Sequence, residues 1–147
     1  MPNNSGDGVK DYLVTGVKKF VGYLSDTYED NINRADEEGY SDGIQVGIRR
    51  TVAALYDTDV NDNEIIRVLL KFWGIDKADA ERRLLREKWW AAVRELEQYL
   101  KIQGYSDTEI EQFMKSNNTV VKIHDNRDLW KLRRNPEKLL KAVQDSE

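Results

Sequence analysis

The longest uninterrupted pattern of hydrophobic and polar positions lies between Asp76 and Gly104. Apolar side chains recur there at steps of three and four residues, which places them on one face of an α-helix. Asp76 is a good N-cap, and Gly104 fits the left-handed position that follows a last helical turn. The pattern predicts a long amphipathic helix over about 77–103 on which the rest of the chain packs. The predicted inward face consists of Leu85, Trp89, Ala92, Val93, Leu96, Tyr99 and Leu100.

Helical spacing of apolar residues also precedes this segment. Over 9–35 the apolar side chains again recur at steps of three and four, and one helix or two helices broken near Ser25–Asp26 both fit. A turn is expected at 38–40, and Ser41 would cap the helix that follows it. The helices predicted on this side cover 9–37, 42–56 and 63–73, with Gly74 ending the third, and residues 1–8 are expected to be flexible.

Two further segments follow the long helix. Ser106 and Glu109 have the spacing of a capping box, which predicts a helix over 107–115. The run Thr119–Ile123 is rich in β-branched residues, so it is interpreted as either a short strand or the start of a helix.

A last helix is predicted over 128–143. Pro136 divides it, because proline fits the first position of a helix better than it fits a helix interior. Asn135 would then be the N-cap of the final helix.

These elements define an all-α fold. We expect a compact bundle of five to seven helices around the long helix, with one short β segment near 119–123 as the variant. A length of 147 residues suits a single domain over 1–147, in which 115–147 is a candidate basic C-terminal subdomain.

Composition narrows the classes of protein that remain. The chain has no cysteine, which excludes disulfides and thiolate metal sites. No apolar run approaches the roughly 20 residues that cross a bilayer, and the first residues carry no secretory signal pattern. We therefore expect a cytoplasmic protein that does not bind membranes.

Candidate chemistry is sparse. His124 is the only histidine, and no serine lies in a nucleophile context, so no catalytic residue is predicted and the protein is expected not to be an enzyme. The loop that starts with Asp57, Asp59 and Asn61 resembles the first half of an EF-hand loop. Asp62 and Val68 then replace its essential glycine and glutamate. We predict a polar loop in which Asp59 or Asp62 caps the third helix, with no metal and no cofactor.

Charge is polarised along the chain. Residues 1–62 carry 12 acidic and 6 basic side chains, whereas 63–147 carry 15 acidic and 17 basic ones, within a net charge of −4. The acidic N-terminal part and the slightly basic C-terminal part are therefore expected to attract different partners.

The acidic side chains concentrate over 26–42, where Arg34 is the single basic residue. An acidic stripe attracts a basic surface and can imitate a phosphate backbone. This segment predicts contact with a basic protein, for example as a DNA-mimicking inhibitor of a nucleic-acid-handling enzyme; a solvated helix face is the alternative. The acidic cluster consists of Asp26, Glu29, Asp30, Asp36, Glu37, Glu38 and Asp42.

Basic side chains gather over 115–141, which holds eight of them against three acidic ones. The predicted helix, turn and following segment over 107–123 have the order of a helix-turn-helix motif, which suggests DNA as the alternative partner. The overall acidity of the chain weighs against tight DNA binding. The candidate DNA contacts are Lys122, Arg127, Lys131, Arg133 and Arg134.

Two other features concern contact surfaces. Trp89 and Trp90 point about 100° apart on a helix, and Trp90 lies off the main apolar stripe, so it is the candidate interface aromatic. Gly39, Gly43 and Gly47 repeat every four residues, which lets another backbone approach closely, either within the chain or in a homodimer. The sequence thus predicts a non-enzymatic helical binding protein, with a protein partner favoured over DNA.

Overall fold

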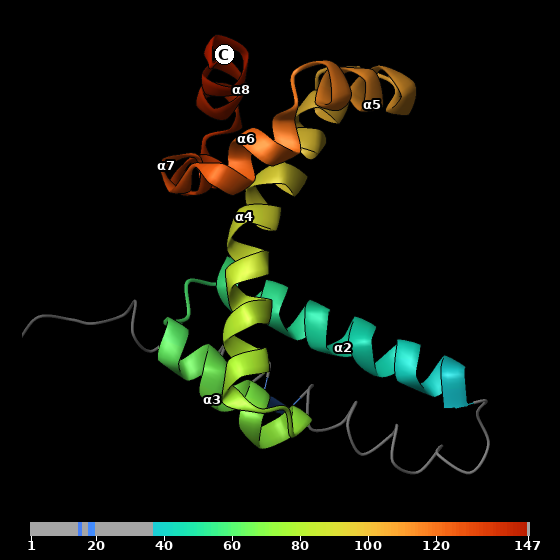
Figure 1. The fold of residues 1–147 in the computed structure, drawn as a ribbon, viewed down its shortest axis with the longest axis vertical. Coiled ribbons are helices and arrows are strands. Elements are labelled where there is room, and N and C mark those ends of the chain that lie inside the picture. Colours follow the sequence, from blue (N-terminus) through green and yellow to red (C-terminus); the bar gives the residue numbers. More distant parts are fainter. Residues whose placement is uncertain (1–14, 16–17, 20–36, 147) are drawn as a thin grey trace, which may run out of the picture. The chain divides into compact units, whose positions relative to one another are not determined.

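The computed structural model describes residues 15, 18–19 and 37–146 (Figure 1). Within this part of the chain all regular structure is helical, with seven α-helices and one 3-10 helix, which confirms the all-α class and the upper end of the predicted five to seven helices. The predicted flexible segment 1–8 and most of the predicted helix 9–37 lie outside the described residues. The helices are α2 (Glu37–Asp57), α3 (Asp62–Trp73), α4 (Lys77–Ile102), α5 (Asp107–Ser116), α6 (Thr119–Asp125), α7 (Arg127–Trp130), the 3-10 helix η1 (Lys131–Arg134) and α8 (Pro136–Asp145).

Helix α2 begins earlier than the sequence suggested. The turn predicted at 38–40 is helical, so the prediction of Ser41 as N-cap is wrong. A single glycine costs a helix about 1 kcal/mol, which is too little to end one that tertiary packing supports.

The N-cap of α3 is Asn61 rather than either of the two residues that the sequence suggested. The side chain of Asn61 accepts a hydrogen bond from the backbone amide of Glu64 at 2.9 Å, so neither Asp59 nor Asp62 is the cap. Asp59 instead adopts a left-handed conformation with φ of 59°. Gly74 ends α3 with φ of 65°, as predicted.

Helix α4 begins at the predicted residue and ends one residue before the predicted position 103. Its first turn is capped by Asp76, which accepts from the amide of Asp79 at 2.8 Å. Gly104 follows its last turn with φ of 97°, a conformation that other residues rarely adopt. None of the described helices is long and apolar enough to span a membrane.

The predicted capping box at the start of α5 is present in full. Ser106 accepts from the amide of Glu109, and the Glu109 carboxylate accepts from the amide of Ser106 at 2.7 Å. After a turn at Asn118, which has φ of 50°, the run Thr119–Ile123 is helical and belongs to α6. Burial of Thr119 and Ile123 against the rest of the fold outweighs the weak strand propensity of β-branched residues.

The end of the chain divides at Pro136 as predicted. Asn135 accepts from the amide of Lys138 at 3.2 Å, and Pro136 occupies the first turn of α8. The preceding segment is not one helix but α7 followed by η1.

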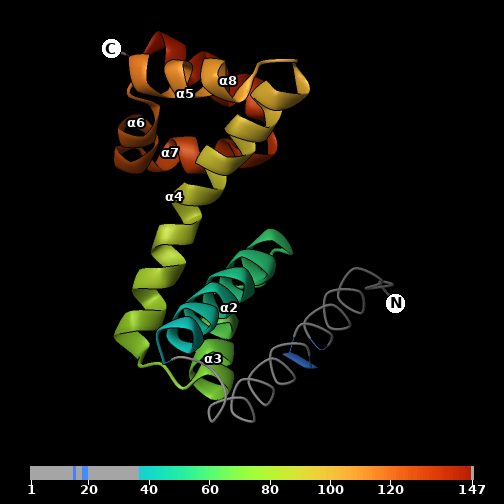
Figure 2. The ribbon, with the colours of Figure 1, turned by 90° about the vertical axis from the view of Figure 1, so that its right-hand side faces the viewer.

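The chain forms two compact units, residues 1–87 and 88–147, and the boundary falls inside α4 (Figure 2). The prediction of a single 147-residue domain stays a prediction, since this division does not decide whether both units unfold together. The hydrophobic core of the N-terminal unit comprises Ile48, Val52, Leu55, Ile65, Val68, Leu69, Ala80 and Leu84. The core of the C-terminal unit comprises Ala92, Val93, Leu96, Leu100, Ile110, Met114, Ile123, Leu129, Leu139 and Val143.

The predicted inward face of α4 is wrong at one residue, Leu85. Leu85 is 46% exposed, whereas Leu84 is buried. Leu84 lies four residues after Ala80, and both enter the core of the N-terminal unit. The stripe that continues through Leu96 and Leu100 serves the core of the C-terminal unit instead.

Within the N-terminal unit, Gly47 of α2 packs under Trp73 of α3. A Cβ atom at position 47 would lie 2.6 Å from a ring carbon of Trp73. The indole nitrogen of Trp73 donates to the hydroxyl of Thr51 at 3.1 Å, and that hydroxyl donates to the carbonyl of Gly47 at 2.9 Å. The close approach that the glycine series predicted is therefore intramolecular at position 47.

Candidate partner-binding groove

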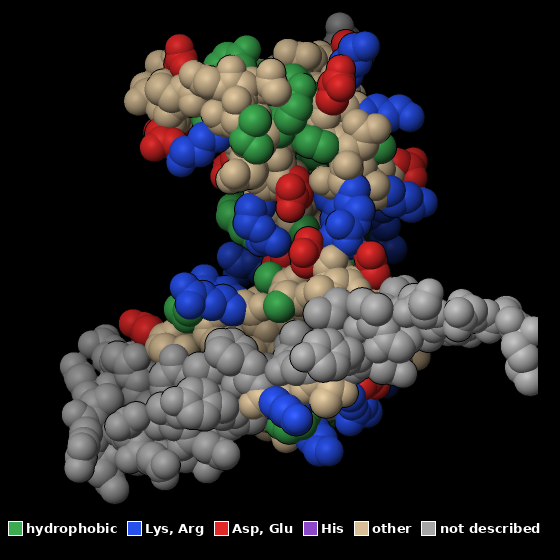
Figure 3. Space-filling view, turned by 180° about the vertical axis from the view of Figure 1, so that it is seen from behind, with side chains coloured by type: hydrophobic (Ala, Val, Ile, Leu, Met, Phe, Trp, Pro, Cys, Tyr) green, Lys and Arg blue, Asp and Glu red, His purple; other side chains and the backbone are tan. Residues whose placement is uncertain are grey.

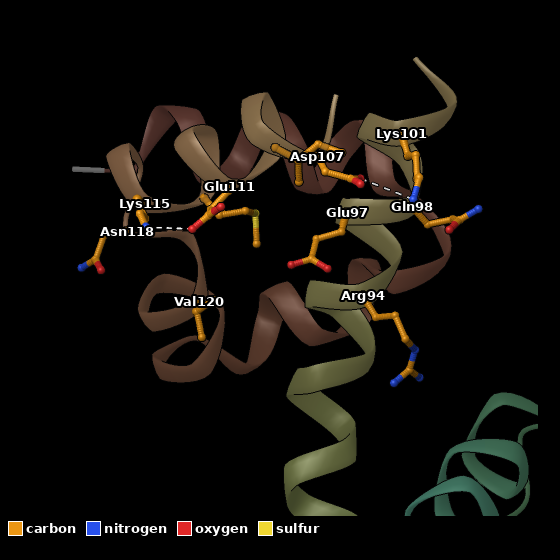
Figure 4. Close-up of a pocket in the computed structure, with 11 residues that line it drawn as sticks. Arg94, Glu97, Gln98, Lys101, Asp107, Glu111, Lys115, Asn118 and Val120 are labelled. Carbon is orange, nitrogen blue, oxygen red and sulfur yellow. Dashed lines mark hydrogen bonds and ion pairs between the residues drawn. The ribbon is translucent and has the colours of Figure 1, made fainter. Parts of the chain in front are cut away.

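The C-terminal unit has a groove of about 620 Å³ between the C-terminal half of α4 and the pair α5–α6 (Figure 4). Helix α4 contributes one wall, and α5 with the start of α6 contributes the other. The lining residues are Arg94, Glu97, Gln98, Lys101, Asp107, Ile110, Glu111, Met114, Lys115, Asn118 and Val120.

The two walls of the groove are positioned by helix-end signals in the sequence. The turn at Gly104 ends α4, and the capping box at Ser106 starts α5 at once. On each wall the lining residues recur at helical spacing, so they form one continuous face rather than scattered positions. The turn at Asn118 then brings Val120 of α6 to the same groove.

The floor of the groove is apolar. Ile110 and Met114 are each 8% exposed and also belong to the core of the C-terminal unit. Val120 is 36% exposed. Methionine is unbranched and adapts its shape to what it contacts, so a floor that contains Met114 can accommodate different apolar side chains.

The rim of the groove carries two ion pairs. Lys101 lies 3.4 Å from Asp107, and Lys115 lies 2.8 Å from Glu111. The hydrogen bond between Lys115 and Glu111 lowers the pKa of the Glu111 carboxyl and raises that of the Lys115 ammonium. All four side chains are largely exposed, so these pairs contribute little to stability and leave the rim hydrated.

Glu97 is the exception among the charged lining residues. Figure 4 shows its carboxylate directed toward α5 and α6, over the apolar floor. It forms no ion pair or hydrogen bond with any other described residue. Arg94, one turn earlier on α4, already interacts with a neighbouring group and points away from α5 in Figure 4.

A second and smaller hollow of about 350 Å³ lies near the turn after α4. Two exposed apolar side chains occur in this region, Ile102 at 72% and Tyr105 at 51%. Among the described residues, no three His, Asp or Glu side chains lie close enough together to hold a metal ion.

The acidic cluster falls mostly outside the described residues. Asp26, Glu29, Asp30 and Asp36 lie there, and the same holds for the side chains of Glu37 and Glu38, whose backbone begins α2. Asp42 is exposed on α2. Contact between this cluster and a basic partner therefore stays a prediction.

The structure gives the predicted basic residues varied surroundings. Lys122 donates to the carbonyl of Val143 at 3.0 Å, and Arg127 lies 5.6 Å from the ring centre of Trp130. Lys131 lies 3.7 Å from Asp128. Arg133 is half-buried and Arg134 is exposed, both on η1. Figure 3 shows basic and acidic side chains interspersed on the visible face of the C-terminal unit rather than a patch of one sign.

Trp90 is 39% exposed, in agreement with its choice as the more accessible of the two adjacent tryptophans. Its ring meets that of Trp89 edge-on, with centres 5.4 Å apart, and Trp89 packs on the core. The His124 ring contacts Trp89 at 5.1 Å, and its Nδ1 lies 2.9 Å from Asp125. Trp90 does not line the groove.

The sequence did not reveal the groove itself. The helix predicted over 107–115 contains Ile110 and Met114, but no sequence pattern marks these two residues, Glu97 or Val120 as the lining of a groove. Their helical spacing was visible, but the pairing of α4 with α5–α6 depends on a chain reversal whose angle no sequence pattern specifies.

Comparisons with known protein families, with curated proteins and with solved structures found no match.

Proposed function

We propose that this chain is a non-enzymatic binding protein that acts through protein–protein contact, and that its groove between α4 and α5–α6 receives the partner. The observation that carries the proposal is the composition of the groove. An apolar floor of Ile110, Met114 and Val120 lies within a charged, hydrated rim. Interfaces between proteins have this arrangement, with an apolar centre and a polar periphery.

The extent of the groove suits a protein segment. The lining residues of α4 run from Arg94 to Lys101, about 11 Å along the helix axis at 1.5 Å per residue. Those of α5 run over a similar length, from Asp107 to Lys115. A helix that lies between two walls of this length can place two or three anchoring side chains on the floor.

The test compares substitutions at neighbouring positions of α6. Val120→Arg puts a charge on the groove floor, whereas Val121→Arg makes the same change at an exposed position outside the groove. Each full-length variant is used to capture partners from the native host, with identification by mass spectrometry. The proposal expects a partner that wild type and Val121→Arg retain and Val120→Arg loses; retention by Val120→Arg would refute it.

The acidic cluster provides a second route to a protein partner. A DNA-mimicking inhibitor would place these carboxylates on a basic surface and would associate faster at low salt. Changing Asp30, Glu37 and Glu38 to Lys should then weaken capture of the same partner and flatten its salt dependence. Unchanged binding would leave the cluster as a solvated surface.

DNA binding is the alternative function, and one observation favours it. Helix α5, the turn at Asn118 and α6 follow one another in helix-turn-helix order. The composition of α6 weighs against it, because its exposed side chains carry no permanent positive charge and Lys122 already donates to the main chain. These exposed side chains are Val120, Val121, His124 and Asp125.

A further inference from the structure

We infer that the occupant of the groove is an amphipathic helix of another protein with a Lys or Arg placed to meet Glu97. This inference rests on the proposed function and adds the chemistry of the partner. It makes Glu97 the residue that selects a basic helix over an acidic one.

The apolar floor indicates how the apolar side chains of the partner helix are spaced. Ile110 and Met114 lie four residues apart on α5, and Val120 extends the apolar surface onto α6. A helix covers such a floor with apolar side chains at positions i, i+3 or i+4 and i+7. A peptide that binds by adding a strand would instead need an unpaired sheet edge, and the described residues contain no strand.

The charged lining residues indicate which charge the partner helix carries. Lys101 and Asp107 neutralise each other, as do Glu111 and Lys115. Arg94 points away from α5 and is already engaged. Within a lining of three basic and three acidic residues, Glu97 is therefore the carboxylate that pairs with no other described residue.

A bound helix would remove water from Glu97. Taking a carboxylate out of water is unfavourable unless a partner replaces the lost hydrogen bonds. A Lys or Arg next to the apolar face of the bound helix supplies both charge and donors, whereas a Glu there would repel Glu97. Charge complementarity therefore selects a basic amphipathic helix.

Two designed peptides test this selection on the full-length protein. Both have about 14 residues, roughly four helical turns, with leucines at i, i+3, i+4 and i+7. One carries Lys at the remaining positions and the other carries Glu, and each has a fluorescent label for anisotropy titration. Wild type is expected to bind the Lys peptide about tenfold more tightly than the Glu peptide.

A charge reversal with a matched control separates Glu97 from bulk attraction. Glu97→Lys should weaken Lys-peptide binding about five- to tenfold, because it turns attraction into repulsion within the groove. Asp145→Lys changes the net charge equally at an exposed position of α8 outside the groove, and it should change binding by less than about twofold. Equal losses from both variants, or tight binding of the Glu peptide, would overturn the inference.

The location of binding is read from amide chemical shifts. Addition of the Lys peptide should shift Ile110, Met114 and Val120, and Val120→Arg should abolish the effect while Val121→Arg preserves it. Shifts confined to other residues would overturn the inference.

Other occupants give distinct outcomes. If the protein is a dimer that Val120→Arg dissociates, the occupant of the groove is a second copy of the chain. If Val120→Arg shifts the resonances of residues 9–24 before any peptide is added, the occupant is that segment of the same chain. Either result would overturn the inference. A captured partner that depends on Val120 but not on Glu97 would leave the proposed function intact and refute only this inference.

Discussion

Val120 and Val121 are neighbours on α6 and are both exposed, yet only Val120 lines the groove between α4 and α5–α6. We expect Val120→Arg and Val121→Arg to leave the free energy of unfolding within about 0.5 kcal/mol of wild type, as surface substitutions usually do. Only Val120→Arg should weaken partner binding, by tenfold or more if it blocks the floor, since about 1.4 kcal/mol corresponds to a factor of ten. Urea denaturation and binding titration measure the two effects separately.

Gly47→Ala should destabilise the N-terminal unit. Alanine gains about 1 kcal/mol of helix propensity over glycine, but its Cβ would lie 2.6 Å from the Trp73 ring. Overpacking costs about 1–3 kcal/mol, so we expect a net loss of up to about 2 kcal/mol in urea denaturation. The loss should shrink in a Trp73→Phe background, where the contacted ring carbon is absent. A more stable Gly47→Ala protein would contradict the close packing.

Leu96 and Leu85 provide a paired test of the two sides of α4. Leu96 is fully buried, so Leu96→Ala should cost about 2–5 kcal/mol through lost burial and the cavity that remains. Leu85 is 46% exposed, so Leu85→Ala should cost less than about 1 kcal/mol. Unfolding in urea monitored by circular dichroism compares them, and equal losses would show that the burial of α4 is misassigned.

Glu64 makes part of the stability dependent on acid pH. Hydrogen bonds from Arg67 and then Lys18 lower the pKa of its carboxyl from 4.5 to about 2. Because the folded pKa is the lower one, the stabilisation is complete above the unfolded pKa and is lost as pH falls from about 5 toward 2. Partial exposure of the three side chains limits the contribution to about 0.2–1 kcal/mol.

The matching measurement is the urea midpoint at pH 7 and pH 3. Glu64→Gln should be less stable than wild type at pH 7 and should approach it at pH 3, where wild-type Glu64 begins to protonate. Glu111→Gln should show the same trend with a smaller amplitude, because the Lys115–Glu111 ion pair is more exposed to solvent than the Glu64 carboxylate. A difference between Glu64→Gln and wild type that does not change with pH would refute the assignment.

The DNA alternative makes its own prediction for the basic residues of η1. If that surface binds DNA, Arg133→Glu with Arg134→Glu should weaken binding in a mobility-shift assay. The slope of log affinity against log salt should fall by about one for each ion pair with a DNA phosphate that the substitutions remove. An unchanged shift would exclude these residues from DNA binding, and an absence of binding by wild type would remove the alternative.

Helix ends were the most predictable part of this structure. Asp76, the Ser106–Glu109 capping box and Asn135 before Pro136 act through hydrogen bonds within one turn, so the local sequence contains all the information they need. Ser41 was predicted wrongly, since the helix continues through it with support from packing further along α2. The choice of Asn61 over its acidic neighbours required the loop conformation.

Side-chain exposure and the groove were harder to predict. Periodicity placed Leu85 on the inward face, but a shift of one residue moves a side chain by about 100° around a helix, and Leu84 took the buried position. The groove joins residues of α4 to residues of α5 and α6 across a chain reversal. Its unpaired carboxylate, Glu97, is one of 27 acidic residues and carries no sequence pattern that marks it.

The packing of Trp73 on Gly47 has a spectroscopic consequence. Trp73 is the only tryptophan of residues 1–87, and the other three, Trp89, Trp90 and Trp130, fall within residues 88–147. A protein that keeps Trp73 and carries phenylalanine at the other three positions would emit tryptophan fluorescence from the N-terminal unit alone. The complementary Trp73→Phe protein would emit from the C-terminal unit, so ligand binding and unfolding of each unit can be followed optically without an added label.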